Sequence, residues 1–285
     1  RPNRAYANSR DGSHFEGKEQ ISHLGNVEDD HVVHNPADGK YYMFYWDRAA
    51  APWDSVMKGG DHQPSGLFVA VSNDETHFDF DHATRINVEG QQWPVKYSHV
   101  IKEGNEWIMF YGQAVTRGHS SMTGIATSTD LVHWTKRAFP VVKGHDAEIL
   151  KTGEDSWYLF YAPDSFFDMP GANVRLATYQ GKLSALFEEP RSRADTGGWS
   201  AYPGNPVLKP GEKGAWDAGA LGSMTILKAG NLFHMYYEAW GVRDKRLEDY
   251  NSLQIGHATS RDGLHWKKDP INPVLPKGTD SAWDA

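Results

Sequence analysis

The sequence predicts an all-β protein: a five-bladed β-propeller of four-stranded antiparallel blades, whose fifth blade is split between the termini and is incomplete in this chain. Three recurring phrases predict it. One is an apolar strand that ends in tyrosine, another is a strand and turn that leads into a histidine and an aromatic residue, and the third is a Pro-Val linker. Such repetition indicates an array of similar units, whereas the strands of a β-sandwich, the alternative fold, share no common phrase.

The apolar strands lie at residues 41–45, 107–111, 157–161 and 233–237. Each follows a short turn that contains Gly or Asp, which is typical of a β-hairpin. The tyrosines that end these strands are about 50 to 76 residues apart, which leaves room for four strands in each unit. This period is too long for WD40 repeats, although Trp-Asp dipeptides are present. These tyrosines are Tyr45, Tyr111, Tyr161 and Tyr237.

The strand and turn of the second phrase occupies residues 7–12, 70–74, 126–130 and 258–263. A histidine and an aromatic residue follow it each time. Because the histidine recurs at one place in the repeat, we expect these four histidines to be structural. They are His14, His77, His133 and His265. The linkers begin at Pro140, Pro206 and Pro273.

We expect one propeller domain over residues 1–285, in which residues 1–28 form the outer strands of the split blade. Four blades follow, at residues 29–96, 97–144, 145–217 and 218–276, and residues 277–285 start the split blade. The tripeptide Trp283-Asp284-Ala285 repeats Trp216-Asp217-Ala218, which opens the fourth blade. The chain is therefore expected to be a piece of a longer protein whose inner strands of that blade lie outside this sequence.

Composition narrows the possible functions. The net charge is −8, with no run of Lys or Arg, which argues against nucleic acid and anionic membranes as partners. No apolar stretch approaches the roughly 20 residues of a membrane span. Cysteine is absent, which excludes disulfides, thiolate nucleophiles and cysteine metal ligands. The chain starts at Arg1, so we expect a leader to be missing and the protein to be secreted or periplasmic, with a cytoplasmic location left open.

The predicted inner strand of each blade begins with polar residues and continues with an apolar pair. Side chains alternate between the two faces of a strand, so the more polar set is expected to face the central tunnel. This set is Asp29, His31, Tyr97, His99, Asp146, Glu148, Ser223 and Thr225. Glu238 directly follows the terminal Tyr237 and closes its strand, next to Ala239 and Trp240.

The blade phrases Ala-Thr-Ser-x-Asp-Gly-x-His-Trp and Gly-x-x-Tyr-x-Met-Phe-Tyr resemble those of the five-bladed propeller glycoside hydrolases over nearly the whole chain. Families 43 and 117 are closer than families 32, 62 and 68, since the Asn-Asp-Pro-Asn-Gly-like motif of the sucrose-acting families is absent. The resemblance implies that Asp29 matches the base aspartate of family 43, and that His99 stands where its auxiliary aspartate does. His145, Asp146 and Glu148 lie near the position of the acid.

The sequence thus predicts a glycosidase that cleaves a plant or algal oligosaccharide by inversion, with the two catalytic groups about 6.5–9.5 Å apart. Asp29 is the expected base and Asp146 or Glu148 the expected acid. His31, His99 and Glu238 are the expected supporting groups. The histidine acid of family 117 leaves that role open to His31, His99 or His145.

Substrate binding is expected at both the inner strands and the rim loops. Aromatic rings stack on sugars, and Arg binds carboxylate or sulfate, so we expect an acidic or anhydro-sugar oligosaccharide. The loops between second and third strands are expected at residues 48–64, 115–122, 164–171 and 239–251. The predicted binding residues are Asp30, His31, His145, Trp240, Arg48, Arg117, Trp53 and Arg243.

Two other functions remain open: a carbohydrate-binding propeller without activity, and a glycoside phosphorylase, for which Arg48 and Arg117 are the candidate phosphate ligands. No cofactor is expected. No His-Glu-x-x-His motif is present, so no catalytic metal is expected, while a structural calcium ion in the tunnel remains open. The oligomeric state is also left open.

Overall fold

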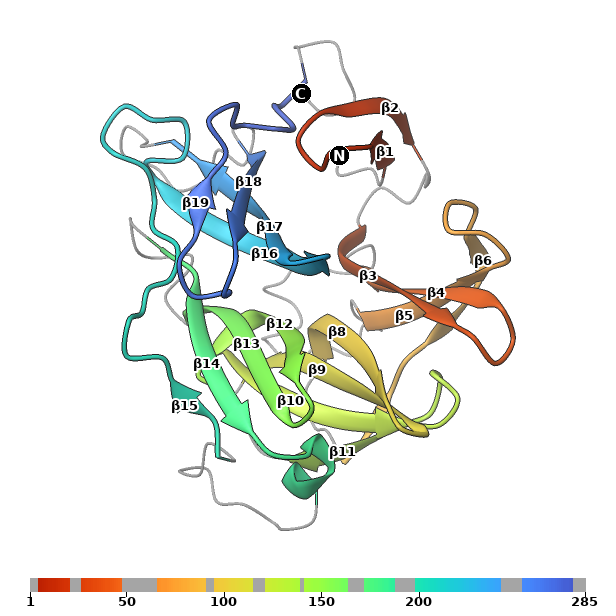
Figure 1. The fold of residues 1–285 in the computed structure, drawn as a ribbon. Helices are drawn as coiled ribbons and strands as arrows, with labels where there is room; N and C mark the ends of the chain where they lie inside the picture. The colour runs from red at the N-terminus through yellow and green to blue at the C-terminus, as the bar shows by residue number, and fades with distance from the viewer. Residues whose placement is uncertain are drawn as a thin grey trace. The chain divides into compact units, whose positions relative to one another are not determined.

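The computed structural model of the 285-residue chain describes residues 5–20, 27–47, 66–90, 95–114, 121–138, 141–163, 172–187, 198–241 and 253–278. These residues form strands and one short 3-10 helix, η1 (Leu183–Leu186). Four sheets have the sequential strand order of propeller blades, and a two-stranded sheet precedes them (Figure 1). The all-β propeller class is therefore confirmed. Among the described residues, none lies in a helix with the length and apolarity needed to cross a membrane.

The chain divides into two compact units. Unit 1 comprises Arg1–Tyr6, Glu19–Ala147 and Gly181–Gly198, and unit 2 comprises Ala7–Lys18, Glu148–Gln180 and Trp199–Ala285. The predicted single domain and its blade boundaries stay a prediction.

Unit 1 contains two complete sheets. The strands of the first sheet are β3 (Val27–Asn35), β4 (Lys40–Asp47), β5 (Gly66–Ser72) and β6 (Asp79–Arg85). Those of the second are β8 (Val95–Glu103), β9 (Glu106–Ala114), β10 (Ser121–Ser128) and β11 (Trp134–Ala138). A fifth strand, β7 (Val88–Glu89), pairs in parallel with β11, which the sequence repeat did not indicate.

The third sheet contains β12 (Gly144–Gly153), β13 (Ser156–Pro163), β14 (Arg175–Gln180) and β15 (Ser200–Ala201). Its outer strand β15 lacks the Asp-Gly-x-His-Trp phrase, so the sequence pattern missed it. The fourth sheet contains β16 (Ala220–Ala229), β17 (Leu232–Trp240), β18 (Gln254–Ser260) and β19 (Lys267–Lys268). Strand β17 contains the apolar strand predicted at residues 233–237, and β18 contains the start of the strand and turn predicted at residues 258–263.

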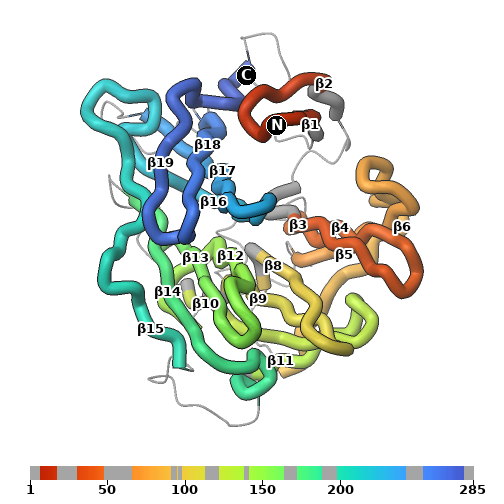
Figure 2. The backbone as a smooth tube through the Cα atoms, viewed as in Figure 1, coloured from red at the N-terminus to blue at the C-terminus, as the bar shows by residue number. Residues whose placement is uncertain are grey.

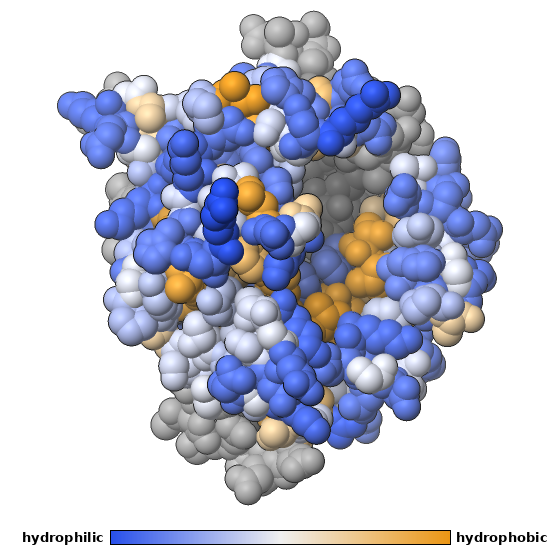
Figure 3. Space-filling model, viewed as in Figure 1, coloured by the Kyte–Doolittle hydropathy of each residue, from blue (hydrophilic) through white to orange (hydrophobic). Residues whose placement is uncertain are grey.

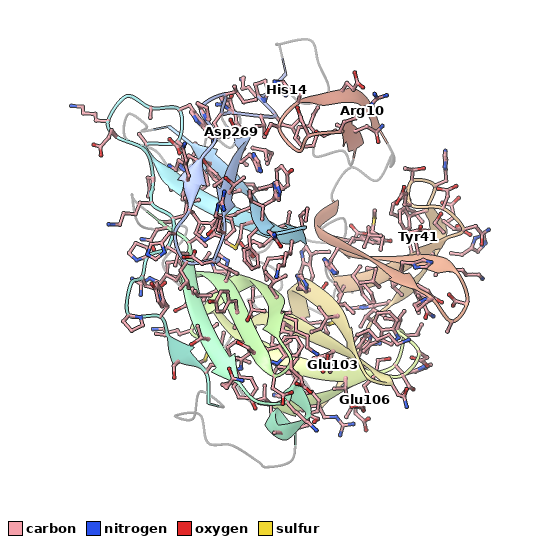
Figure 4. The ribbon with its side chains drawn as sticks, viewed as in Figure 1. Arg10, His14, Tyr41, Glu103, Glu106 and Asp269 are labelled. Atoms are coloured by element: carbon pink, nitrogen blue, oxygen red, sulfur yellow. The ribbon has the colours of Figure 1, made fainter. Side chains whose placement is uncertain are left out.

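The predicted N-terminal hairpin is present as β1 (Ala5–Ser9) and β2 (Phe15–Gln20). Within unit 2 its turn lies against the fourth sheet, because Tyr236 Oη donates to the carbonyl oxygen of Gly12 at 2.8 Å (Figure 2). The ring of Phe15 packs edge-on against Tyr236. Figure 4 places Arg10 and His14 on this hairpin, and Asp269 on the segment after β19. Residues 283–285, the predicted start of the split blade, lie outside the described residues.

The Ser-x-Asp turns explain the repeated histidine. In the last turn, Ser260 Oγ accepts a hydrogen bond from the amide of Gly263, and Asp262 Oδ1 accepts one from the amide of His265. The ring nitrogen Nδ1 of His265 lies 2.7 Å from Asp262 Oδ2. The turns that contain His14, His77 and His133 have the corresponding aspartate–histidine contact. The structural role predicted for the four histidines is therefore confirmed.

The core of each unit lies on the apolar faces of its sheets. In unit 1, Phe44, Met109 and Trp134 are among the buried cluster, and in unit 2, Phe160 and Met235 are. The terminal tyrosines of the first phrase are also buried, so they belong to the core. Burying such aromatic residues contributes a large share of the stability of a β-protein.

Candidate active site

In unit 1, the inner strands β3 and β8 bring His31 and His99 together. Their ring centroids are 4.3 Å apart, and the rings are tilted by 32°. His31 Nε2 lies 3.0 Å from the carbonyl oxygen of Val100, so Nε2 carries the hydrogen and donates it. The two histidines have equivalent positions in their sheets, because His31 is paired with Phe44 and His99 with Phe110.

Burial and the neighbouring His99 lower the pKa of His31 to about 3, although the hydrogen bond to Val100 acts in the opposite direction. His31 is therefore neutral at physiological pH, with the lone pair on Nδ1. A neutral imidazole of this kind suits binding better than proton donation. This disfavours His31 as the histidine acid that the resemblance left open.

In unit 2, the equivalent positions of β12 and β16 also meet. Thr225 Oγ1 donates a hydrogen bond to Glu148 Oε2 at 3.4 Å. Thr225 is paired with Tyr236 of β17, and Glu148 directly precedes the apolar pair of its strand. Each unit thus shows the same relationship: neighbouring inner strands bring together the residues that precede their apolar pairs.

Three inner strands contain a β-bulge near their start. Between Glu28 and His31, β3 has one residue more than the partner β4, and similar shifts occur in β8 after Lys96 and in β16 after Leu221. A bulge interrupts the alternation of side chains. The regular alternation used to place Asp29 on the face of His31 therefore does not hold there. The side chains of Asp29, Asp30 and Tyr97 lie outside the described residues, and the assignment of Asp29 as base stays a prediction.

The third inner strand is irregular at Asp146, which has φ of +52°. Successive side chains of a regular strand point to opposite faces. Here, in contrast, His145 Nδ1 lies 3.0 Å from Asp146 Oδ2, and the two side chains are only 4% and 6% exposed. Left-handed backbone at a residue other than glycine is a form of strain that clusters at functional sites. The pair is internal, which suits a positioning role, and the predicted catalytic and binding roles of these residues stay predictions.

Glu238 and Trp240 do not lie where the sequence pattern placed them. The sequence pattern predicts that the strand ends at Glu238 and that Trp240 lies in the loop that follows. The structure extends β17 to Trp240, because Glu238 is paired with Ile255 of β18 and Trp240 with Ala220 of β16. The polar residue Glu238 interrupts the apolar pattern, so the sequence did not indicate this extension. Both side chains are partly buried on the face of β17 opposite Tyr237.

The remaining predicted binding residues, Arg48, Trp53, Arg117 and Arg243, lie outside the described residues.

Within unit 1, His31 and His99 offer nitrogen donors, which suit transition metals rather than the calcium ion considered from the sequence, because calcium prefers oxygen ligands. The calcium ion stays a prediction. On the face shown in Figure 3, hydrophilic residues cover most of the surface over β4 and β6.

No protein-family model and no curated protein matched the sequence. The fold, however, is similar to that of solved structures. A thermostable family-43 glycoside hydrolase is 15% identical, with a TM-score of 0.63, and the match covers 90% of this chain and 75% of that one. Zg3597, a family 117 glycoside hydrolase of the marine bacterium Zobellia galactanivorans, is 15% identical with a TM-score of 0.56, over 86% of this chain and 70% of that one.

A third similar structure is an N-acetylgalactosamine deacetylase from F. plautii in complex with blood group B trisaccharide. It is 13% identical, with a TM-score of 0.63, over 89% of this chain and 80% of that one. The resemblance to propeller glycoside hydrolases is therefore confirmed at the level of the fold. Because the same fold also occurs in a deacetylase, the fold alone does not specify the reaction.

Proposed function

We propose that this protein is a glycoside hydrolase that cleaves a plant or algal oligosaccharide by inversion. The observation that carries the proposal is the carboxyl group of Glu148, which is partly exposed on inner strand β12 and receives a hydrogen bond from Thr225. The likeness of nearly the whole chain to a family-43 glycoside hydrolase supports it.

Glu148 is the better of the two candidate acids. A catalytic acid must reach the oxygen of the leaving group. Asp146 is 6% exposed and contacts His145, whereas Glu148 is partly exposed. In the proposed reaction, Glu148 protonates the glycosidic oxygen, and Asp29 removes a proton from the water that attacks the anomeric carbon. In this proposal, His145 and Asp146 have a structural role and hold the start of β12 in place. Thr123 also holds this segment, because its hydroxyl donates a hydrogen bond to the carbonyl oxygen of Gly144.

The substrate is proposed to be an acidic or anhydro-sugar oligosaccharide. Trp240, Trp53 and the rim arginines Arg48, Arg117 and Arg243 are its proposed contacts, with Asp30 and His31 nearer the reacting bond. Glu238 and His99 are supporting groups. Matched neutral and charged oligosaccharides test the preference by calorimetric titration, and tighter binding of the neutral members would contradict it.

Activity is tested by a screen of plant and algal oligosaccharides with three forms of the protein: the unchanged chain, Glu148→Gln and Glu154→Gln. Glu154 is a matched control, because it is exposed in the turn between β12 and β13. Loss of a general acid is expected to lower kcat by about 100- to 10,000-fold. The Glu154 variant is expected to keep full activity. Unchanged hydrolysis by Glu148→Gln would remove Glu148 as the acid.

The stereochemistry and products test the rest of the proposal. NMR of the fresh product is expected to show the anomer opposite to that of the substrate. Hydrolysis unchanged in Asp29→Asn would remove Asp29 as the base. Binding without cleavage would instead indicate a carbohydrate-binding propeller, cleavage that requires phosphate would indicate a phosphorylase, and release of acetate would indicate a deacetylase.

A further inference from the structure

Thr225 lies in a strand of unit 2 that packs against the core. It lies in β16 between Met224 and Ile226, which are 6% and 7% exposed and belong to the core cluster of the unit. Its own side chain is on the opposite, exposed face, as alternation along a strand requires. The pairing of Thr225 with Tyr236 fixes the backbone at this point.

The side chain of Thr225 is suited to directing a hydrogen bond. A β-branched residue has few accessible χ1 rotamers, so its hydroxyl points in a restricted direction. That hydroxyl lies 3.4 Å from Glu148 Oε2 and donates to it. Glu148 has a longer and more flexible side chain, and a fixed donor reduces the number of orientations that its carboxyl group adopts.

We propose that Thr225 is a positioning residue for Glu148: its hydroxyl holds Oε2 and thereby orients the carboxyl group for proton transfer to the glycosidic oxygen. This inference rests on the proposed function of Glu148. In the proposed proton transfer, the proton of the Glu148 carboxyl group passes to the glycosidic oxygen as the bond to the anomeric carbon breaks. The electron pair of that bond stays on the departing oxygen, and the carboxylate that remains keeps the hydrogen bond from Thr225.

Two substitutions separate the hydroxyl from the shape of the side chain. Thr225→Val keeps the β-branched shape and removes the hydroxyl, whereas Thr225→Ser keeps the hydroxyl. We expect Thr225→Val to lower kcat about two- to tenfold, which corresponds to the loss of one hydrogen bond, with little change in KM. We expect Thr225→Ser to recover most of that loss. A matched control is Thr152→Val, at the other end of β12, where the hydroxyl donates to Ser156 instead.

The rescue by serine provides a readout that a general change in packing does not reproduce. Thr225→Ser keeps the donor but changes the shape of the side chain, so a loss caused by packing would persist in it. Thr152→Val is expected to leave kcat and KM unchanged. An unchanged kcat in Thr225→Val, or an equal loss in Thr225→Ser, would overturn the inference.

A double-mutant cycle distinguishes failure of this inference from failure of the proposed function. In the Glu148→Gln background, Thr225→Val is expected to have little further effect on residual activity, because the proton donor is already absent. No hydrolysis by the unchanged chain would contradict the proposed function itself, and full activity of Glu148→Gln would contradict the role of Glu148 as its acid. A large loss in Glu148→Gln with no effect of Thr225→Val on the unchanged chain would contradict only the role of Thr225.

Discussion

Ser13 Oγ donates a hydrogen bond to Asp269 Oδ2 at 2.7 Å, although 256 positions separate the two residues in the sequence. The same carboxylate oxygen lies 3.1 Å from Nδ1 of buried His257. Burial alone would raise the pKa of Asp269, but the hydrogen bonds from Ser13, the Ile271 amide and His257 outweigh it and lower that pKa. The N-terminal hairpin is thereby attached to the fourth sheet within unit 2.

Replacing Ser13 is expected to weaken this attachment. Ser13→Ala removes the donor to Asp269 and should lower the free energy of unfolding by about 1 kcal/mol. Hydrogen exchange should also become faster in β1 and β2 than elsewhere. The measurements are urea unfolding and hydrogen–deuterium exchange, with Ser200→Ala, at an exposed serine of β15, as the control. Equal exchange in the two variants would show that Ser13 does not hold the hairpin.

The Ser-x-Asp turns predict sensitivity to acid. Burial would raise the pKa of Asp262, but hydrogen bonds from His265 and from the amides of His265 and Leu264 outweigh it and hold that pKa well below the ordinary 3.8. A carboxyl group whose pKa is lower in the folded state adds stability above about pH 4, and this stability is lost as the pH falls further. Asp262→Ala should therefore cost about 1 kcal/mol at neutral pH, by analogy with a lost helix cap, and lose less stability on acidification. Denaturant unfolding of the two proteins from pH 7 to pH 2 measures the free energy of unfolding at each pH. Parallel curves of that free energy against pH would contradict the role of Asp262.

Position 263 favours glycine for two reasons, its backbone conformation and the lack of space for a Cβ atom. Its φ is +74°, and an added Cβ would lie 2.9 Å from Cε2 of Tyr158. Gly230 has φ of +60° with no atom within 4 Å of an added Cβ, so Gly230→Ala measures the conformational cost alone. We expect about 1 kcal/mol for Gly230→Ala and a clearly larger loss for Gly263→Ala. Thermal unfolding of the two variants measures their losses of stability. Equal losses would mean that the ring of Tyr158 moves aside freely.

Asn205 and Asn272 directly precede the linker prolines, and their side-chain amides pair with a strand backbone as a neighbouring strand would. Asn272 accepts a hydrogen bond from the amide of His257 at 2.7 Å and donates one to its carbonyl oxygen at 2.8 Å. Asn205 makes the same two bonds with Leu176. Asn272→Asp keeps the acceptor and removes the donor, so we expect it to destabilise the protein by about 1–3 kcal/mol. Asn231→Asp, at an exposed turn, is the control for added charge, and a similar effect of both substitutions in urea unfolding would refute the prediction.

His31 is expected to stay neutral over the physiological range. Because burial and His99 lower its pKa to about 3, from 6.5, the NMR signal of its ring should not titrate between pH 8 and pH 5. The unfolded chain takes up this proton near pH 6.5, so stability from His31 is full above that pH and declines as the pH falls toward 3. His31→Gln identifies the signal and should flatten stability against pH in that window. A ring that titrates near pH 6.5 would disprove the prediction.

The sequence identified the propeller fold, the apolar strands such as residues 233–237, and the structural role of histidines such as His265. It did not identify β7, β15, or the extension of β17 through Glu238. The missed strands are two-residue segments, and no periodic pattern can be read from so few positions. At the candidate site, the residues before the apolar pairs were identified, while the bulges after Glu28, Lys96 and Leu221 were not.

By itself, the sequence determined what depends on near neighbours. The alternation that buries Met235 and the hydrogen bonds by which Asp262 closes its turn involve residues a few positions apart, so the pattern shows them directly. Only the tertiary structure decided which distant residues meet: His31 with His99, Glu148 with Thr225, and Ser13 with Asp269. The reason is physical. A bulge or a contact between sheets is set by how one strand registers against another, and that register is a property of packing rather than of either strand alone.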